Sequence, residues 1–301
     1  MDEMKEIMAD CRKAGIKVLS PDVNESEATF SVNKNGDIRY GLGGLKGFGE
    51  NVVEAIIRER GEHGPFSDLF DFVERTAEML NRRAFETLVY AGALDSFGYK
   101  RSQFFLPCKN GELCIDEIVK YANLYRNDQL DSANSLFGEV EELKPVRPEV
   151  PTFSGDEDVL ALLQQEKEFV GMYLSSHPLE RYRFEIETFT DWKLAELQER
   201  IDECELADKN GKAAVAGIVA DVKTLTTRSG SPGARVVVED FDGTYEFALF
   251  GKDYEALLPY MQLHAQIYIE GEISARDFIK PEERAQGKKA PYGFKIKKIN
   301  L

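Results

Sequence analysis

With 301 residues, 43% of them hydrophobic, the chain is long enough for two or three domains, and its formal net charge of −16 argues against a protein that simply coats nucleic acid. Its longest apolar runs, such as residues 213–220, are far shorter than the roughly 20 residues of a membrane-spanning helix. The N-terminus is charged from Asp2 onward and lacks a secretory signal. We therefore expect a cytoplasmic protein with no membrane partner.

The acidity is concentrated in the middle of the chain. Residues 101–208 hold 11 Lys and Arg against 24 Asp and Glu, whereas residues 209–301 hold 14 against 12. The C-terminal third is therefore slightly basic, although the chain as a whole is acidic.

Residues that could carry chemistry are scattered. The four cysteines and three histidines follow no metal-ligand or nucleophile spacing. Two acidic groups, Asp156-Glu157-Asp158 and Glu239-Asp240 with Asp242, fall where turns are expected, and we interpret both as solvated clusters. The sequence thus predicts no catalytic residue, no metal and no cofactor.

The first 40 residues predict a helix followed by short strands. Met4, Ile7, Met8 and Cys11 have helical spacing, and Gly15 ends the pattern. Strands are expected near residues 16–19, 29–32 and 38–40, and Asn35-Gly36-Asp37 predicts a hairpin turn between the last two.

Residues 45–96 predict two helix-turn-helix units in tandem. The glycine-rich segment 41–49 contains neither a dinucleotide fingerprint in a βαβ unit nor a P-loop. Gly47 and Gly49 would allow backbone amides at a helix N-terminus to approach a phosphate, with Lys46 beside them. This helix-hairpin-helix interpretation, which predicts sequence-independent contact with a DNA backbone, stands against a simpler glycine-rich turn for close packing.

The second unit has its turn at residues 80–83, so Arg82 and Arg83 would add two cations. Because exposed arginine pairs are common at helix starts, a merely solvated pair remains the alternative.

Residues 129–152 predict a linker, since periodicity disappears and three prolines interrupt a Glu-rich sequence. Within it, Leu136 and Phe137 are large apolar residues in a polar stretch, which is typical of a motif that docks into a partner's pocket. The alternative is that the pair packs back onto the chain's own helices. Further helices are expected at residues 159–170, ending near Gly171, and at 193–201.

The last third changes to the two-residue period of strands. Strands are expected at residues 213–225, 235–240, 245–250, 266–272 and 293–299, with a helix at 253–260 between the third and the fourth. This is the order of an OB-fold. The fold class is therefore multidomain α+β: a mostly helical tandem helix-hairpin-helix domain followed by an all-β OB-fold barrel.

An OB-fold binds oligonucleotides on its second and third strands and the flanking loops. Lys223, Arg228 and Arg235 would supply cations there. The alternation places Tyr245 and Phe247 on one face of the third strand and Phe250 on the other, so only one of these sets can be exposed for base stacking. We expect weak, salt-sensitive binding of single strands, with a protein partner as the alternative ligand of the same face.

Several longer stretches resemble the bacterial DNA polymerase III alpha subunits, the C-family replicative polymerases. The stretches that carry the resemblance are residues 11–26, 39–47, 64–72, 91–95, 166–168 and 171–179. The resemblance covers essentially the whole chain. It implies that residues 1–40 end the fingers domain, that 41–208 form the helix-hairpin-helix and clamp-binding domain, and that 209–301 form the OB-fold.

In that family a pentapeptide similar to Gln-x-x-Leu-Phe binds the ring-shaped sliding clamp. The matching positions here are Ala133, Asn134, Ser135, Leu136 and Phe137, with Ala133 in place of the glutamine. The family's catalytic aspartates lie upstream, so the resemblance implies a non-catalytic part of a nucleotidyltransferase. The implied partners are duplex DNA, the single-stranded template, the clamp and the remainder of the polymerase holoenzyme.

Two other hypotheses come from different classes. A helix-hairpin-helix repair enzyme, a nuclease or a glycosylase, could also carry an OB-fold, but it would need a catalytic Lys or Asp or a metal-binding acid cluster near the hairpin. A free single-strand-binding protein is disfavoured by the net charge of −16.

Overall fold

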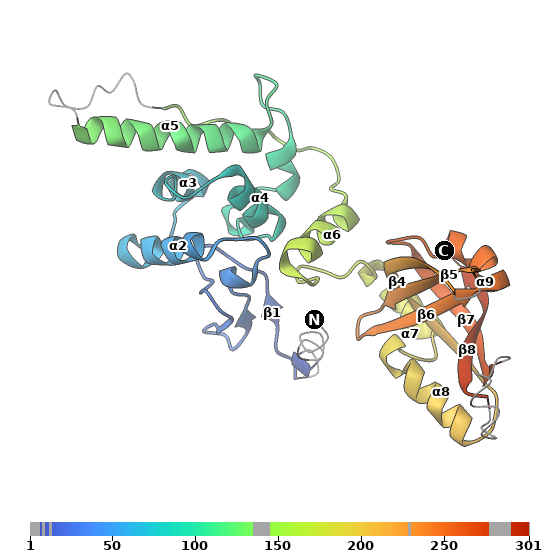
Figure 1. Ribbon diagram of the computed structural model, residues 1–301. Helices are drawn as coiled ribbons and strands as arrows, with labels where there is room; N and C mark the ends of the chain where they lie inside the picture. Colours follow the sequence, from blue (N-terminus) through green and yellow to red (C-terminus); the bar gives the residue numbers. More distant parts are fainter. Residues whose placement is uncertain are drawn as a thin grey trace. The chain divides into compact units, whose positions relative to one another are not determined.

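The computed structural model describes residues 7, 10, 11, 14–134, 145–227, 230–276 and 290–300, with side chains in the helix ending at Asn134 described as far as Gln129. The chain forms two compact units, divided between His177 and Pro178 (Figure 1). We call Asp10–His177 the helical unit and Pro178–Leu301 the sheet unit. Within the described ranges, no helix is long and apolar enough to cross a membrane.

The helical unit begins with a small sheet in the order β1-β3-β2. Gly36, with φ +85°, supplies the left-handed residue of the expected hairpin between β2 and β3. The elements of the unit are β1 (Val18–Leu19), β2 (Ser31–Val32), β3 (Ile38–Arg39), η1 (Leu42–Gly44), α2 (Glu50–His63), α3 (Leu69–Arg75), α4 (Arg82–Tyr90), η2 (Asp95–Phe97), η3 (Arg101–Phe105), α5 (Cys114–Asn134) and α6 (Val159–Val170).

The two expected tandem units are η1 with α2 and α3 with α4. Each helix of the second unit starts at a side-chain cap: Asp68 accepts bonds from the amides of Phe70 and Asp71, and Asn81 accepts one from Ala84. The turn predicted at residues 80–83 was therefore placed too late, because the Asn81 cap makes Arg82 and Arg83 the first residues of α4.

Helix α5 was not predicted from the sequence. It packs against α3 and α4 (Figure 1) and buries Ile115, Ile118 and Ala122 along one side. Their spacing of three and four residues is the signal that could have revealed it. Because α5 continues to Asn134, the first residues of the predicted linker are helical.

The described remainder of that linker, residues 145–152, has no regular secondary structure but is held by side chains. Arg147 donates to Glu74 at 2.7 Å and its guanidinium lies 5.5 Å from the centre of the Phe70 ring. Gln103 donates to the carbonyl of Pro151 at 2.6 Å. This segment is thus fixed to the helical unit.

The sheet unit contains five antiparallel strands in the order β6-β5-β4-β7-β8. Its elements are η5 (Glu180–Tyr182), α7 (Arg183–Phe189), η6 (Leu194–Glu196), α8 (Leu197–Leu206), β4 (Gly211–Thr226), β5 (Pro232–Glu239), β6 (Thr244–Phe250), α9 (Gly251–Leu257), η7 (Leu258–Tyr260), β7 (Gln266–Ala275) and β8 (Tyr292–Asn300). The helix between the third and fourth strands is present, so the order expected of an OB-fold is confirmed.

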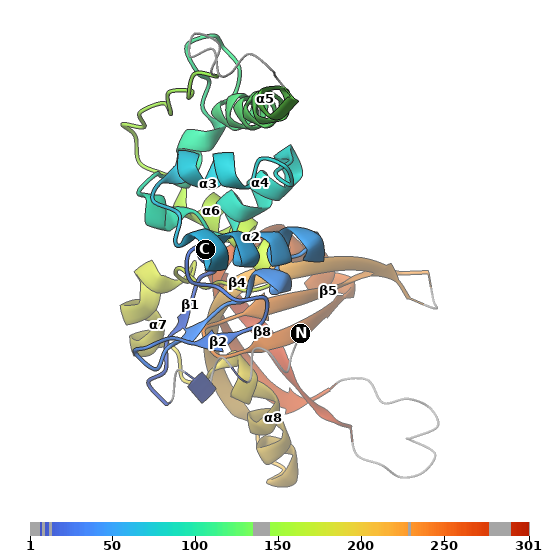
Figure 2. The ribbon, with the colours of Figure 1, turned by 90° about the vertical axis from the view of Figure 1, so that its left-hand side faces the viewer.

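The sheet is not closed into a complete barrel, because β6 and β8 remain its two edges among the described strands. Side chains nevertheless meet across the opening: Phe247 of β6 and Phe294 of β8 have ring centres 6.0 Å apart. Helix α8 contacts β7 and β8 (Figure 2) and adds Leu197 and Ile201 to the same core. Residues 178–206 therefore pack with the sheet.

Two local features differ from what the sequence predicts. A glycine inside a strand predicts a bend at Gly217, but the irregularity in β4 lies between Val219 and Asp221. Gly217 is instead required for packing, since a Cβ there would lie 2.5 Å from Val238 Cγ1. Glu239 and Asp240, interpreted above as solvated, are buried. Asp240 accepts bonds from the amides of Leu194, Asp242 and Gly243, and thereby fixes the turn after β5.

Candidate nucleic-acid interface

The glycine-rich hairpin lies between η1 and α2. Phe48 is buried and anchors it, whereas Lys46, Gly47 and Gly49 are exposed around it. Gly47 has φ +72°, and Gly49 is the N-cap of the 14-residue helix α2. Because Gly47 and Gly49, on either side of Phe48, have no side chains, the backbone amides at the N-terminus of α2 are accessible. Such amides attract an anion.

The C-terminal end of helix α6 is hydrogen-bonded to the hairpin. The Lys46 amide donates to the carbonyl of Phe169 at 2.8 Å. The Tyr40 hydroxyl lies 2.9 Å from each of the carbonyl oxygens of Gly44 and Val170 and shares its single proton between them; burial raises the pKa of Tyr40. The hairpin is thus fixed by residues far away in sequence, while its glycines remain accessible.

Of the two predicted arginines, Arg83 lies at the hairpin. A Cβ on Gly47 would be only 3.0 Å from Arg83 Nη2, so the absence of a side chain at Gly47 gives the guanidinium its position. Together with exposed Lys46, it places two cations beside the hairpin backbone. Neither cation forms an ion pair with a residue of the described ranges.

Arg82 has different neighbours. Its guanidinium donates to Asp116 of α5 at 2.6 Å and to Glu86 at 3.0 Å. The hydrogen bond and the charge of Asp116 raise the pKa of Arg82, and Glu86 adds to the effect. The structure therefore separates the pair: Arg83 joins the hairpin, and Arg82 joins α4 to α5.

On the sheet unit, Lys223 of β4 and Arg235 of β5 are direct cross-strand partners. Each has a carboxylate nearby: Lys223 is 2.7 Å from Asp221, which raises the pKa of that lysine, and Arg235 is 3.6 Å from Glu246. Arg228, the third predicted cation, lies outside the described residues. This surface is thus less positive than its lysine and arginine content suggests.

The aromatic side chains of β6 are divided as the alternation predicts. Phe247 is buried and Tyr245 packs against the core, whereas 46% of Phe250 is exposed. The Phe250 ring covers Gly233, its cross-strand partner, where a Cβ would lie 2.6 Å from Phe250 Cδ1. One exposed ring is therefore available on this strand for stacking on a base.

The clamp-binding pentapeptide is only partly described. Ala133 and Asn134 end α5, and Ser135, Leu136 and Phe137 lie outside the described residues. The assignment of these five residues to clamp binding stays a prediction.

The acidic groups have structural roles where the structure describes them. Asp158 caps α6 by accepting from Ala161 at 3.1 Å, and Glu157 accepts from the Ser102 hydroxyl at 2.6 Å. Within the described part of the chain, no group of three or more His, Cys, Asp or Glu side chains could hold a metal ion. The four cysteines are free thiols.

Sequence reasoning missed the cluster around Glu166, which positions the end of α6. The fully buried carboxylate accepts from the amides of Leu174 and Ser175 at 2.6 and 2.8 Å, and from Arg101 at 2.9 Å. Arg101 in turn binds Asp95 at 2.6 Å. These bonds fix α6, whose last turn contacts the hairpin; the signal was a glutamate inside an apolar helical pattern.

Known proteins match both the hairpin region and the chain as a whole. A family model described as a helix-hairpin-helix motif matches residues 15–104. The DNA polymerase III subunit alpha of Pseudomonas aeruginosa is 31% identical over 291 residues, and that of Thermus aquaticus is 34% identical over 273. These alignments cover 92% and 90% of this chain. Along this stretch, the chain is homologous to the DNA polymerase III alpha subunits.

The chain spans about a quarter of the length of these relatives, since the alignments cover 24% and 21% of them. Among solved structures, the mitochondrial single-stranded DNA binding protein Rim1 of S. cerevisiae matches 30% of this chain and 94% of its own, at 16% identity and a TM-score of 0.21.

Proposed function

We propose that this chain is a non-catalytic C-terminal region of a replicative DNA polymerase, which binds DNA and tethers the sliding clamp. The observation that carries the proposal is the homology to DNA polymerase III alpha subunits along more than nine-tenths of the chain. In this proposal residues 1–40 end the fingers domain and the hairpin belongs to the clamp-binding domain. Its chemistry is recognition, and its benefit is a high local concentration of polymerase at the primer end.

The hairpin binds the backbone of duplex DNA in this proposal. Its support is the combination of the exposed glycines 47 and 49 with the cations Lys46 and Arg83 at the start of a 14-residue helix. Backbone amides and two cations bind phosphates without reading bases. Binding should therefore be independent of sequence and strongly sensitive to salt.

Titrating duplex DNA at several salt concentrations tests this role. Replacing both Lys46 and Arg83 by alanine should weaken binding and lower the log-log salt slope by roughly 0.9 for each phosphate that the variant no longer neutralises. Arg82→Ala is the matched control, because that arginine is held by Asp116 and Glu86. An unchanged slope in the double variant, or an equal decrease in the control, would place the DNA elsewhere.

Clamp tethering rests on the family motif at residues 133–137. Leu136→Ala with Phe137→Ala should abolish binding to a purified sliding clamp, because two apolar anchors of a short motif act as hot spots worth about 2 kcal/mol or more each. Surface plasmon resonance measures the effect, and Val146→Ala, at an exposed apolar residue outside the motif, serves as the control. Unchanged affinity in the double variant would show that the pair does not anchor the clamp.

The sheet unit contributes weak contact with the single-stranded template. The support is the neighbouring pair Lys223 and Arg235 next to the exposed ring of Phe250. Fluorescence anisotropy with labelled oligo-dT should show weaker binding when Lys223, Arg228 and Arg235 are replaced by alanine. Equal affinity of the variant and the parent would exclude this surface.

A further inference from the structure

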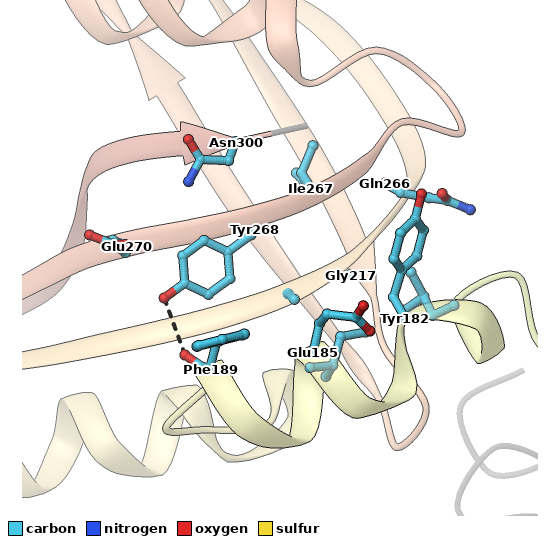
Figure 3. A pocket seen from close by; sticks show the side chains of 12 residues that line it. Tyr182, Glu185, Phe189, Gly217, Gln266, Ile267, Tyr268, Glu270 and Asn300 are labelled. Atoms are coloured by element: carbon cyan, nitrogen blue, oxygen red, sulfur yellow. Dashed lines mark hydrogen bonds between the residues drawn. The ribbon is translucent and has the colours of Figure 1, made fainter.

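A groove lies on the outer side of the sheet, between α7 and the strands β4 and β7. It has a volume of about 610 Å³. In Figure 3, Tyr182, Glu185 and Phe189 lie on the side of α7, opposite Gly217 and Tyr268 of the strands. The groove is not lined by Lys223, Arg235 or Phe250, the residues to which single-stranded DNA was assigned above.

The groove continues into a second hollow of about 470 Å³ that shares Phe189, Tyr268 and Glu270 with the first. At the junction the Tyr268 hydroxyl donates to the carbonyl of Phe189 at 3.1 Å (Figure 3). The second hollow adds two carboxylates, Asp191 and Glu272, and two lysines, Lys212 and Lys297. The two hollows are therefore adjacent, and we call them together the channel. One end has aromatic side chains with Glu185 and Glu270 among them, and the other end is mainly charged.

The exposed apolar surface at this channel is unusual for a short helix. Helix α7 buries none of its residues, and 61% of Phe189 is accessible. Tyr182, at 36%, is also accessible. Large aromatic side chains that line a hollow and stay exposed are typical of a surface that binds an apolar side chain of another molecule.

The charges of the channel indicate what that molecule carries. Four carboxylates line it, Glu185, Asp191, Glu270 and Glu272, against two lysines, and Lys297 is already 3.2 Å from Glu272. Burial raises the pKa of Tyr268, and the negative charges of Glu270 and Asp191 add to it. A phosphate backbone would be repelled here, whereas a Lys or Arg side chain would be attracted.

We propose that this channel is a docking site for a short segment of a partner protein that carries a large apolar residue next to a lysine or arginine. The apolar residue occupies the end lined by Tyr182 and Phe189, and the cation lies among Glu185, Glu270 and Asp191. The site adds a protein contact at residues other than those proposed to bind DNA, and its existence does not depend on them.

Selection of random phage-displayed peptides on the full 301-residue chain tests the proposal. The enriched peptides should combine an apolar residue with a neighbouring cation. The strongest peptide, labelled for fluorescence anisotropy, should bind about ten-fold more weakly to Phe189→Ser, because that variant has no aromatic ring to pack against the peptide's apolar residue. Phe184→Ser is the matched control, since Phe184 is an exposed residue of α7 that does not line the channel.

A charge-reversal variant tests whether the carboxylates of the channel, and not only its apolar side chains, contribute to peptide affinity. Glu185→Lys should weaken binding of the cationic peptide and favour a version whose cation is replaced by glutamate. Glu187→Lys makes the same change on α7 away from the channel and should leave affinity unchanged. The fluorescence of Trp192, the single tryptophan, confirms that each variant stays folded.

Three results would overturn the proposal. They are the absence of any enriched peptide, equal binding of the selected peptide to Phe189→Ser and to the parent, and equal binding of the cationic and acidic peptides. Loss of oligo-dT affinity in Phe189→Ser, with no change in peptide binding, would instead assign the channel to nucleic acid.

Discussion

The helical unit holds its irregular segments with buried polar side chains, whereas the sheet unit relies mainly on strand pairing. Ser26, fully buried, donates to the Tyr40 carbonyl, and Asn24 bonds both the amide and the carbonyl of Phe66. Arg60 donates to the carbonyls of Val23 and Ser26. In the sheet unit, β4 pairs along its whole length, residues 211–226, with β7 on one side and β5 on the other.

This difference agrees with where the stretches that resemble the DNA polymerase III alpha subunits fall. A loop held by a single side chain depends on that residue, because an unpaired buried group costs about 1–3 kcal/mol. A strand position accepts many side chains as long as the alternation is kept. Most of the stretches that carry the resemblance accordingly lie in the helical unit.

The largest expected effect breaks the polar network of the helical unit. Glu166→Ala leaves Arg101 without one partner and removes the acceptor of two amides, so we expect unfolding of this unit to become easier by about 3–5 kcal/mol. Urea unfolding followed by circular dichroism measures the helices, and Trp192 fluorescence follows the sheet unit separately. Glu168→Ala, at an exposed position of the same helix, is the control. A parallel loss in the Trp192 signal would show that the units unfold together.

A packing change at Gly217 should destabilise the sheet unit without affecting the helical unit. Gly217→Ala places a Cβ 2.5 Å from Val238 Cγ1 and 2.7 Å from the Glu239 carbonyl oxygen, and overpacking of this kind costs about 1–3 kcal/mol. The Trp192 transition should move to lower urea while the helical signal is unchanged. An unaltered Trp192 midpoint would mean that β4 and β5 adapt without strain.

Replacing a glycine in the helical unit should instead raise the free energy of unfolding. Gly61 is exposed in α2, and nothing lies within 4 Å of a Cβ placed there. Gly61→Ala should stabilise the helical unit by about 0.5–1 kcal/mol, because alanine restricts the unfolded chain and favours a helix. Thermal unfolding followed by circular dichroism measures the gain in stability. A lower melting temperature of the variant would show that Gly61 does not lie in an unstrained helical position.

The smallest expected effect is a pH dependence of opposite sign in the two units. Burial alone would raise the pKa of Asp71, but the bond from the Ser67 amide and the charge of Arg75 hold it below 3.8. That contribution is present above the unfolded pKa and is lost as pH falls through the folded one. The helical unit should therefore weaken on acidification.

Burial raises the pKa of Asp240 above 3.8, and bonds from three amides offset this only in part. A raised pKa gives stability below the unfolded value that is lost as pH rises through the folded value. Urea midpoints between about pH 3 and pH 6 should thus show this loss in the Trp192 signal, reduced in Asp240→Asn. A variant with the parent's pH profile would assign the dependence to another group.

The sequence alone indicated most of the local elements and the similarity to the DNA polymerase III alpha subunits. Alternation located the five strands, glycines marked the hairpins, and the order of strands and helix indicated the OB-fold. Two predictions were wrong. Helix α5 was overlooked although its apolar spacing is helical, and the turn before α4 was misplaced because Asn81 is the N-cap of that helix.

Only the tertiary structure decided which charges are available. Arg82 and Arg83 are adjacent in sequence, yet one binds Asp116, 34 residues away, and the other lies against Gly47. Glu239 and Asp240 look like a solvated pair in sequence but are buried in the sheet unit. Periodicity reports on neighbours within a few residues, whereas the partner of a charged side chain depends on how distant segments pack. The sequence therefore named the candidate cations but not which of them are paired with carboxylates.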